Sequence, residues 1–483
     1  MVRVAVTAPA TLSYARVIGQ LLAADDDPAV DGTLLDGRCA RAVCMLTVGL
    51  ASLALAAPAR GDSGAVVAAG DPSSVQGIER AAVEPGDSGR ETAATLLYLP
   101  RKAVDLLFRA TGSVAAVMRD QQIVPRIAEL LDPPPGDVSV SPTLTLGGSE
   151  PPLAGAQVIA NAGATTTRLA VGFGGIHDLL GEGRIHFVHP GPVPLAFRLE
   201  GLADTRTGLA YLGVGQVPAQ DPRNHFQHGA ASHQADYWQQ RSRLVSSLGA
   251  RLAKDVQVHA AMTYVDSRVT DAPDDSRTID RVFVSGTVPG APGRSRILYG
   301  ETALRLDTRP TAARPSGGVL MEAYAGEARG VGGDPTRFLR LGGRAAFFVP
   351  ILRRTNVLSV AVILDGLAAP SGAAVPFTQL VGQPDYRGSD DRFDDVSYVV
   401  SVDYRWEFLP FLGARIFVDV AAVGPEAQEL VDERPRAAVG FGLDIYTPST
   451  TLGEVSFAGG ADGVTAALRI GVPSRFGDRL HRY

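Results

Sequence analysis

Beyond residue 137 the chain consists of short runs of alternating apolar and polar residues, separated by Gly, Pro, Asp and Asn. Neighbouring side chains of a β-strand point to opposite faces, so this alternation predicts strands with one apolar and one polar face. No apolar run reaches the ~20 residues of a membrane-spanning helix. The clearest runs are residues 138–146, 167–173, 243–251, 256–265, 282–288, 296–306, 319–324, 345–349, 356–364, 396–406, 415–420, 437–446 and 464–472.

Two neighbouring runs carry charges inside strand-like sequence. Asp403 and Arg405 lie two residues apart in the first run, and Arg415, Phe417 and Asp419 have the same spacing in the second. Because side chains alternate with a period of two, each set shares one face of its strand. Buried charges are tolerated only when they are paired, whereas in a membrane barrel they can face the polar lumen.

These observations predict an all-β fold in which residues 137–483 form a transmembrane antiparallel β-barrel. In lipid an open sheet edge would leave backbone groups without partners, so the strands must close into a barrel. At roughly 20 residues per strand and turn, the segment accommodates about 16 strands. A soluble protein with several sheets would show similar alternation and is the competing interpretation.

Residues 1–59 are interpreted as a leader. Arg38 and Arg41 precede an apolar run at 42–57 that ends in small residues, which is the design of a signal peptide cleaved near Ala59. The late position of this run suggests a start codon placed too far upstream, and a single membrane helix is the alternative. Both cysteines, Cys39 and Cys44, fall inside this leader, so the mature chain would contain none.

Two segments connect the leader to the predicted barrel. Residues 60–95 are rich in Ala, Gly, Asp and Ser without periodicity, and are interpreted as a flexible linker. Residues 96–136 have apolar residues at helical spacing, so we expect a short helical segment before the barrel. Such a segment would pack on or plug the barrel mouth; a helix on the membrane surface is the alternative.

The sequence offers no catalytic constellation, and we expect no enzymatic activity, cofactor or metal site. The net charge of −6 gives no basic face of the kind that binds nucleic acid. His225, His228 and His233 have a spacing that could hold Zn or Ni, but no cysteine joins them. We interpret them as residues of a solvated loop.

Three further motifs carry a family resemblance. Tyr386-Arg387-Gly388 lies in a polar loop, Asp403-Tyr404-Arg405 lies in the next strand, and Phe417-x-Asp419 lies in the strand after it. In this order they resemble the C-terminal barrel of the BamA/TamA (bacterial surface antigen) outer-membrane assembly superfamily. Upstream, Asp307-Thr308-Arg309 followed by Pro315-Ser316-Gly317-Gly318, and the turn Tyr211-Leu212-Gly213-Val214-Gly215, resemble other segments of that family.

The resemblance implies a latch in which the loop folds into the lumen and Arg387 meets Asp403, Phe417 and Asp419. A guanidinium can bind a carboxylate through two hydrogen bonds and stack on an aromatic ring at the same time. Ser389, where the family has an aromatic residue, and Tyr386, where it has an aliphatic one, depart from the pattern. A purely stabilising latch without a role in transport is the alternative. The predicted site comprises Arg387, Gly388, Tyr386, Asp403, Phe417 and Asp419, supported by Arg405, Asp307 and Arg309.

The resemblance also implies a function. We expect a protein of the bacterial outer membrane that assists insertion or translocation of other proteins, with outer-membrane lipid and unfolded outer-membrane proteins as partners. A weakly paired seam between the first and last strands would open laterally to admit a client strand. The family's periplasmic POTRA domains are not evident in the sequence, which favours the alternative of a passive pore or structural surface antigen without client handling.

Overall fold

The computed structural model describes residues 138–470, except for short gaps at 148–151, 176, 190–193, 231, 273–276, 312–313, 352, 354, 372, 374, 389–391, 410 and 447–450. The predicted leader (1–59), linker (60–95) and helical segment (96–136) therefore lie outside the described residues. So does the end of the last expected run, after residue 470.

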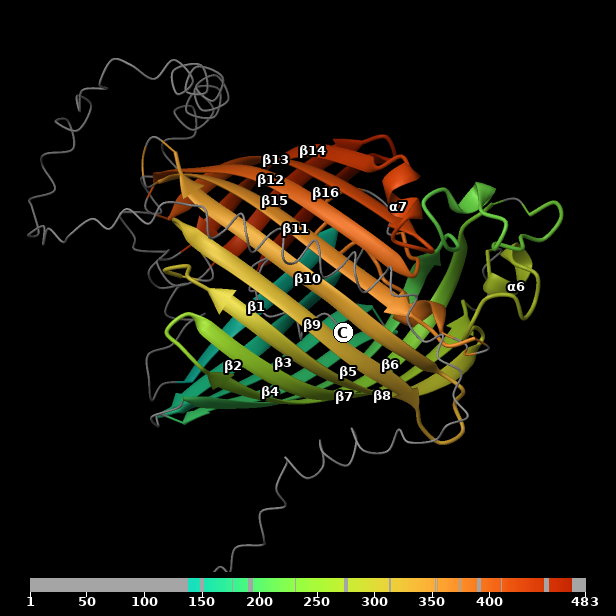
Figure 1. Cartoon of the computed structure of the whole chain (residues 1–483), viewed down its shortest axis with the longest axis horizontal. Helices are drawn as coiled ribbons and strands as arrows, with labels where there is room; N and C mark the ends of the chain where they lie inside the picture. The colour runs from blue at the N-terminus through green and yellow to red at the C-terminus, as the bar shows by residue number, and fades with distance from the viewer. Residues whose placement is uncertain are drawn as a thin grey trace, which may run out of the picture.

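The described residues form one closed barrel of sixteen antiparallel strands, which confirms the predicted fold class (Figure 1). Each strand pairs with its neighbours in sequence, and β16 pairs with β1 to close the sheet. The strands are β1 (Val138–Gly147), β2 (Leu153–Ala162), β3 (Thr165–Gly175), β4 (Asp178–His189), β5 (Leu195–Tyr211), β6 (Ala235–Arg251), β7 (Val256–Asp271), β8 (Gly293–Asp307), β9 (Gly318–Gly330), β10 (Arg337–Pro350), β11 (Asn356–Ala368), β12 (Val396–Leu409), β13 (Leu412–Gly424), β14 (Arg436–Tyr446), β15 (Thr451–Gly460) and β16 (Gly463–Ile470).

One expected strand, at residues 282–288, is wrong. The segment continues from the short helix α6 (Ile279–Val282) into a turn at Gly286, whose φ is +78°. Val282 and Phe283 are consecutive and both buried, which a strand with one solvent-facing side would not allow. They pack with Tyr211 and Phe377 in an apolar cluster between loops. The apolar residues of this run therefore stabilise a loop.

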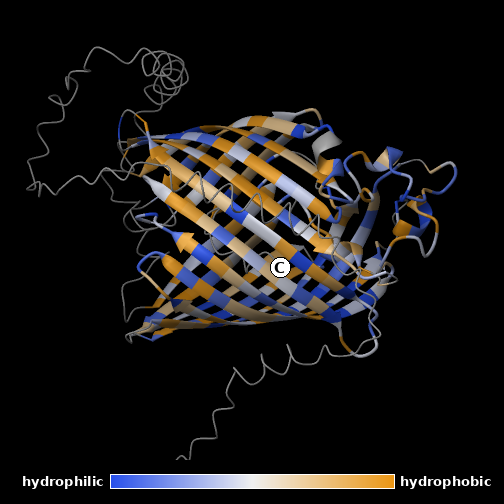
Figure 2. Ribbon diagram, viewed as in Figure 1, coloured by the Kyte–Doolittle hydropathy of each residue, from blue (hydrophilic) through white to orange (hydrophobic). Residues whose placement is uncertain are grey.

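The barrel has an apolar outside and a polar inside, and Figure 2 shows the two kinds of residue alternating along the strands. Phe441 on the outer wall is 53 % exposed, whereas Asp419 on the inner wall is 0 % exposed. A barrel in water would show the opposite arrangement, because apolar side chains leave water when they can. An apolar outer wall around a polar interior is the arrangement that a lipid bilayer requires.

The two ends of the barrel differ. The connections β5–β6, β7–β8 and β11–β12 are long and lie at the right in Figure 1, where α6, the short helix α7 (Glu429–Asp432) and the 3₁₀ turns Pro218–Gln220 and Phe377–Gln379 are found. Most connections at the other end, where β1 begins and β16 ends, are short turns. The barrel therefore has a long-loop end and a short-turn end. None of the helices in the described part of the chain is long and apolar enough to cross a membrane.

Candidate functional site in the barrel lumen

The β11–β12 loop, residues 369–395, returns into the barrel. Backbone hydrogen bonds between Val381 and Asp394 join its two arms in a small antiparallel bridge. At its tip Asp385 has a φ of +68°, a conformation that Asp tolerates better than most residues. This turn brings Arg387 to the inner wall formed by β12 and β13.

Arg387 is held by two buried carboxylates. Its Nη1 donates to Asp403 Oδ1 at 2.6 Å, and its Nη2 and Nε donate to the two oxygens of Asp419 at 2.6 and 2.8 Å. Its backbone N–H also donates to Asp419, at 3.0 Å. Burial disfavours the charged guanidinium, but the carboxylates outweigh this and raise the pKa of Arg387 above its ordinary value. The arginine therefore stays charged at every pH at which the barrel folds.

An aromatic ring completes the contact. The guanidinium carbon of Arg387 lies 3.3 Å from the ring centroid of Phe417, a close cation–π stack. Phe417 itself lies over Gly440 of β14, where a Cβ atom would come within 2.3 Å of the ring. A glycine in a strand often marks such a close approach. Arg387, Asp403, Phe417 and Asp419 are together called the lumen latch below.

Tyr386 and Gly388 flank the latch and position the loop. A Cβ at Gly388 would come within 2.4 Å of the Tyr386 ring, so only glycine lets the loop fold this tightly. The centroid of the Tyr386 ring lies 5.0 Å from the guanidinium carbon of Arg436. The Arg436 guanidinium also donates a hydrogen bond to Gln383 at 3.1 Å. The loop is thus fixed on both sides of Arg387. Ser389 lies outside the described residues.

The three supporting residues take part in other contacts. Asp307 binds Arg309 through two hydrogen bonds of 2.8 Å at the end of β8. Arg405 donates to the carbonyl of Pro315 in the β8–β9 connection, at 2.5 Å. Both contacts lie near the short-turn end, where they tie that connection to the wall. The expected family segments therefore divide into a lumen latch and a separate contact at the short-turn end.

Sequence reasoning missed several residues of the site. Arg436, which supports Tyr386 and also binds Asp462 at 2.6 Å, was not among the expected residues. Gly440 was missed as well, although a glycine inside the alternating run 437–446 was a usable signal. Arg415 was seen to share the inward face, and the structure pairs it with Glu454 of β15. That partner belongs to a strand that was not among the expected runs.

The β5–β6 loop contacts the β11–β12 loop and helps to hold it in place. Gly215, in the β5–β6 loop, donates to the Phe393 carbonyl at 3.0 Å, and Arg223 binds both oxygens of Asp394 at 2.8 and 2.7 Å. Burial and the adjacent Asp394 carboxylate raise the pKa of Asp395 to about 6, although Arg223 acts in the opposite direction. The turn expected at 211–215 is present, with φ of +96° at Gly213.

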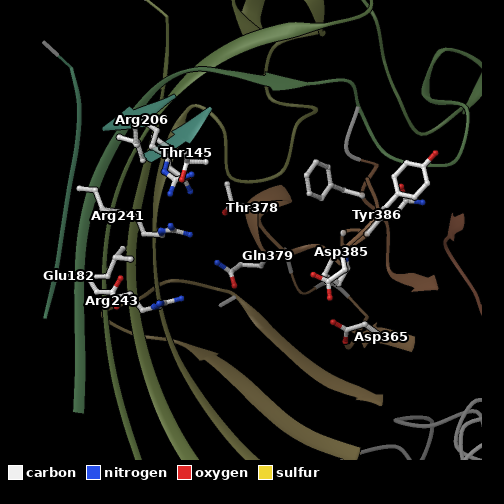
Figure 3. A pocket seen from close by; sticks show the side chains of 18 of the residues that line it. Thr145, Glu182, Arg206, Arg241, Arg243, Asp365, Thr378, Gln379, Asp385 and Tyr386 are labelled. Carbon is white, nitrogen blue, oxygen red and sulfur yellow. The ribbon is translucent and has the colours of Figure 1, made fainter. Parts of the chain in front are cut away.

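Above the latch the lumen contains a cavity of about 670 Å³ (Figure 3). One wall is formed by strands and carries Arg206, Arg241 and Arg243; the other is formed by the loop and includes Gln379 and Asp385. The lining of the cavity combines charged side chains such as Arg344 and Asp365 with apolar ones such as Phe338 and Ile363. Among the residues that the structure describes, no group of three or more His, Cys, Asp or Glu could hold a metal ion.

Fold and site together define a sixteen-stranded membrane barrel whose lumen holds a long loop through an arginine latch. Among solved structures, BamA from Haemophilus ducreyi lacking POTRA domains 1–3 is similar at 12 % identity and a TM-score of 0.47, over 69 % of this chain and 70 % of that one. CdiB from Acinetobacter baumannii (11 %, 0.42) and CdiB from Escherichia coli (8 %, 0.45) are each similar over 68 % of this chain, which spans 60 % and 62 % of theirs. No protein-family model and no curated protein matches the chain.

Proposed function

We propose that this protein is a non-enzymatic outer-membrane barrel that assists the insertion or translocation of other proteins. The observation that carries the proposal is the seam between β1 and β16. These strands pair from Leu144 with Ile470 to Gly147 with Ala467, and the residues that continue this register on either side, 148–151 and those after 470, lie outside the described residues. In the described barrel every other neighbouring pair of strands is consecutive in sequence and joined by a connecting segment, whereas β1 and β16 are the first and last strands.

In the described barrel this seam is closed by strand pairing alone, without a connecting segment between the two strands. The two strands can therefore separate without stretching a connection, so we expect the barrel to open here first. An extended client strand could then add to an exposed edge through main-chain hydrogen bonds.

The lumen latch would support this action by holding the β11–β12 loop in one position while the seam moves. Arg387 contacts β12 and β13, so it lies on the wall near the last strands of the barrel. If the latch keeps this part of the wall rigid, movement of the barrel is confined to the seam.

The test is to close the seam covalently. Thr145→Cys with Arg469→Cys places two cysteines at directly opposite positions of β1 and β16. Ala458→Cys with Thr465→Cys does the same within the long β15–β16 pair and is the matched control. The measurement is the folding rate of an unfolded outer-membrane barrel protein in liposomes containing the purified protein, under oxidising and then reducing conditions.

We expect wild type and control to accelerate client folding, and the oxidised seam variant to lose this effect and regain it on reduction. If wild type gives no acceleration although its own barrel is folded, the insertion role is wrong. An Arg387→Ala variant that folds but does not accelerate would assign the latch a part in the activity. If this variant is fully active, the latch only stabilises the barrel.

A passive pore or surface protein is the second candidate, favoured by the cavity of about 670 Å³ inside the lumen, which is lined in part by arginines and carboxylates. It predicts no effect on client folding in the same liposomes. A steady ionic conductance that the oxidised seam disulfide leaves unchanged would favour this candidate.

A further inference from the structure

The outward faces of β7, β8, β9 and β10 change character along their length. Towards the short-turn end they present exposed apolar side chains, and towards the long-loop end they present charges. On β8 the outward residues from the loop end are Arg294, Arg296 and then Leu298. The charged outward residues of the four strands are Asp266, Arg268, Arg294, Arg296, Glu327, Arg329 and Arg337; the exposed apolar ones include Val258, Met262, Leu298, Leu304 and Val349.

Four of these arginines face one another in pairs. Arg268 of β7 lies directly opposite Arg294 of β8, and Arg329 of β9 lies directly opposite Arg337 of β10. Like charges at opposite positions of antiparallel strands destabilise the sheet. Both pairs lie at the same end of adjacent strands, where they lower the stability of the sheet. The fold alone does not require arginines at these positions.

The nearby carboxylates compensate these charges only in part. Asp266 binds Arg294 through two hydrogen bonds, at 2.8 and 2.6 Å, and Glu327 binds Arg329 at 2.9 Å. Arg296 and Arg337 approach the same two carboxylates, at 3.7 and 3.3 Å. The described outward positions of these strands therefore combine five arginines with two carboxylates. In the β9–β10 loop, the Asp334 carboxylate accepts hydrogen bonds from the backbone N–H groups of Arg296 and Thr336.

The positive groups are accessible from outside the barrel. The side chains of Arg294, Arg329 and Arg337 are 53 %, 59 % and 52 % exposed, so a ligand could reach each of them. Leu298 lies directly opposite Arg329 and is itself exposed on the outer face of the barrel wall. The arginines thus begin where the apolar wall ends. In an outer-membrane barrel with its long loops outside, this border lies at the headgroups of the outer leaflet.

We propose that this arginine band, formed by Arg268, Arg294, Arg296, Arg329 and Arg337, binds the phosphorylated headgroup of an outer-leaflet glycolipid. A guanidinium matches a phosphate through paired hydrogen bonds, and a phosphate between two facing arginines removes their repulsion. The acyl chains of the same lipid would lie against Leu298 and Met262 below the band. The inference does not rest on the proposed function, because a passive barrel would need the same lipid contact.

The test compares two forms of one lipid on the purified full-length protein in detergent. Bisphosphorylated lipid A and its dephosphorylated form are titrated, and binding is followed by native mass spectrometry. The variant Arg268→Gln with Arg337→Gln removes one arginine from each facing pair and leaves the Asp266–Arg294 and Glu327–Arg329 pairs in place. The control, Arg251→Gln with Arg353→Gln, makes the same charge change at exposed positions near the short-turn end. Heat-dependent gel mobility reports whether each variant is folded.

We expect wild type and control to bind the bisphosphorylated lipid at least tenfold more tightly than the dephosphorylated one. We expect the Arg268→Gln/Arg337→Gln variant to lose that preference while keeping a folded barrel. Equal binding of the two lipids by wild type, which needs no variant, would overturn the proposal. So would an equal loss in the control, or displacement of the lipid by equimolar inorganic phosphate, which would indicate a free-phosphate site.

Discussion

At the scale of single residues, Arg387 shows how a charged side chain can be buried in the barrel lumen. Moving an ion out of water costs several kcal/mol, and only close, well-oriented partners offset this. Asp403 and Asp419 supply these partners, and the Phe417 ring covers the guanidinium face. The pair is interdependent, because Asp419 is fully buried and has no access to water if the arginine is removed.

Replacing Arg387 by alanine should therefore lower the free energy of unfolding by about 3–5 kcal/mol, since two buried carboxylates lose their partner. Reversible urea unfolding in lipid vesicles measures this loss. The double variant Arg387→Ala/Asp419→Ala should lose less than the sum of the two single losses, because one stranded charge is gone. Additive losses would show that Arg387 and Asp419 do not stabilise the fold as a pair.

At the scale of elements, three long loops stabilise one another at the long-loop end of the barrel. Tyr211 at the end of β5, Phe283 after α6 and Phe377 in the β11–β12 loop share one apolar cluster. The Arg223 contact with Asp394 adds a polar clamp on the same loops. Asp394, which forms this clamp, is followed by Asp395, so two adjacent carboxylates directly precede β12. We expect the stability of this segment to depend on pH.

The raised pKa of Asp395, about 6, predicts the direction of this pH dependence. An unfolded Asp loses its proton near ~4, so between about pH 4 and 6 the folded state binds more protons. Its contribution to stability is thus present at low pH and is lost as the pH rises to about 6. Asp395→Asn should lack this dependence and gain stability relative to wild type as the pH rises from 4.5 to 7.5.

The measurement is the urea midpoint of both proteins across that pH range. Asp280→Asn, which removes an exposed loop carboxylate in α6, is the control for the loss of one charge. A stability difference between wild type and Asp395→Asn that does not change with pH would contradict the prediction.

At the scale of the whole molecule, the barrel is closed by β1 and β16, which in the described barrel are the neighbouring strands without a connecting segment between them. β5 and β6, by contrast, are consecutive strands that pair at fifteen positions. Because proteins open locally where the structure is least held together, we expect amides of the seam to exchange with solvent well before those of β5 and β6. Hydrogen–deuterium exchange of the protein in vesicles measures this. Equal protection of both regions would show that the seam is not the weak point.

Much of the architecture could be predicted from the sequence because its cause is local. Alternation with a period of two predicted twelve of the sixteen strands and the closure into a barrel of about that number. The shared parity of Asp403 and Asp419 placed them on inward faces, where the structure has them, and the family resemblance supplied Arg387 as their partner. Strands β2, β4, β5 and β15 were not among the expected runs.

What only the tertiary structure decided is which residues face one another. The run at 282–288 alternates like a strand, yet its apolar side chains are buried among loops that are distant in sequence. The Phe417–Gly440 contact, the facing arginines of β7–β10 and the β1–β16 seam all depend on the register between strands. Register is set by pairing across the closed sheet, and a slip of one residue would turn every side chain to the opposite face. Local alternation is the same in either case, so it cannot specify these contacts.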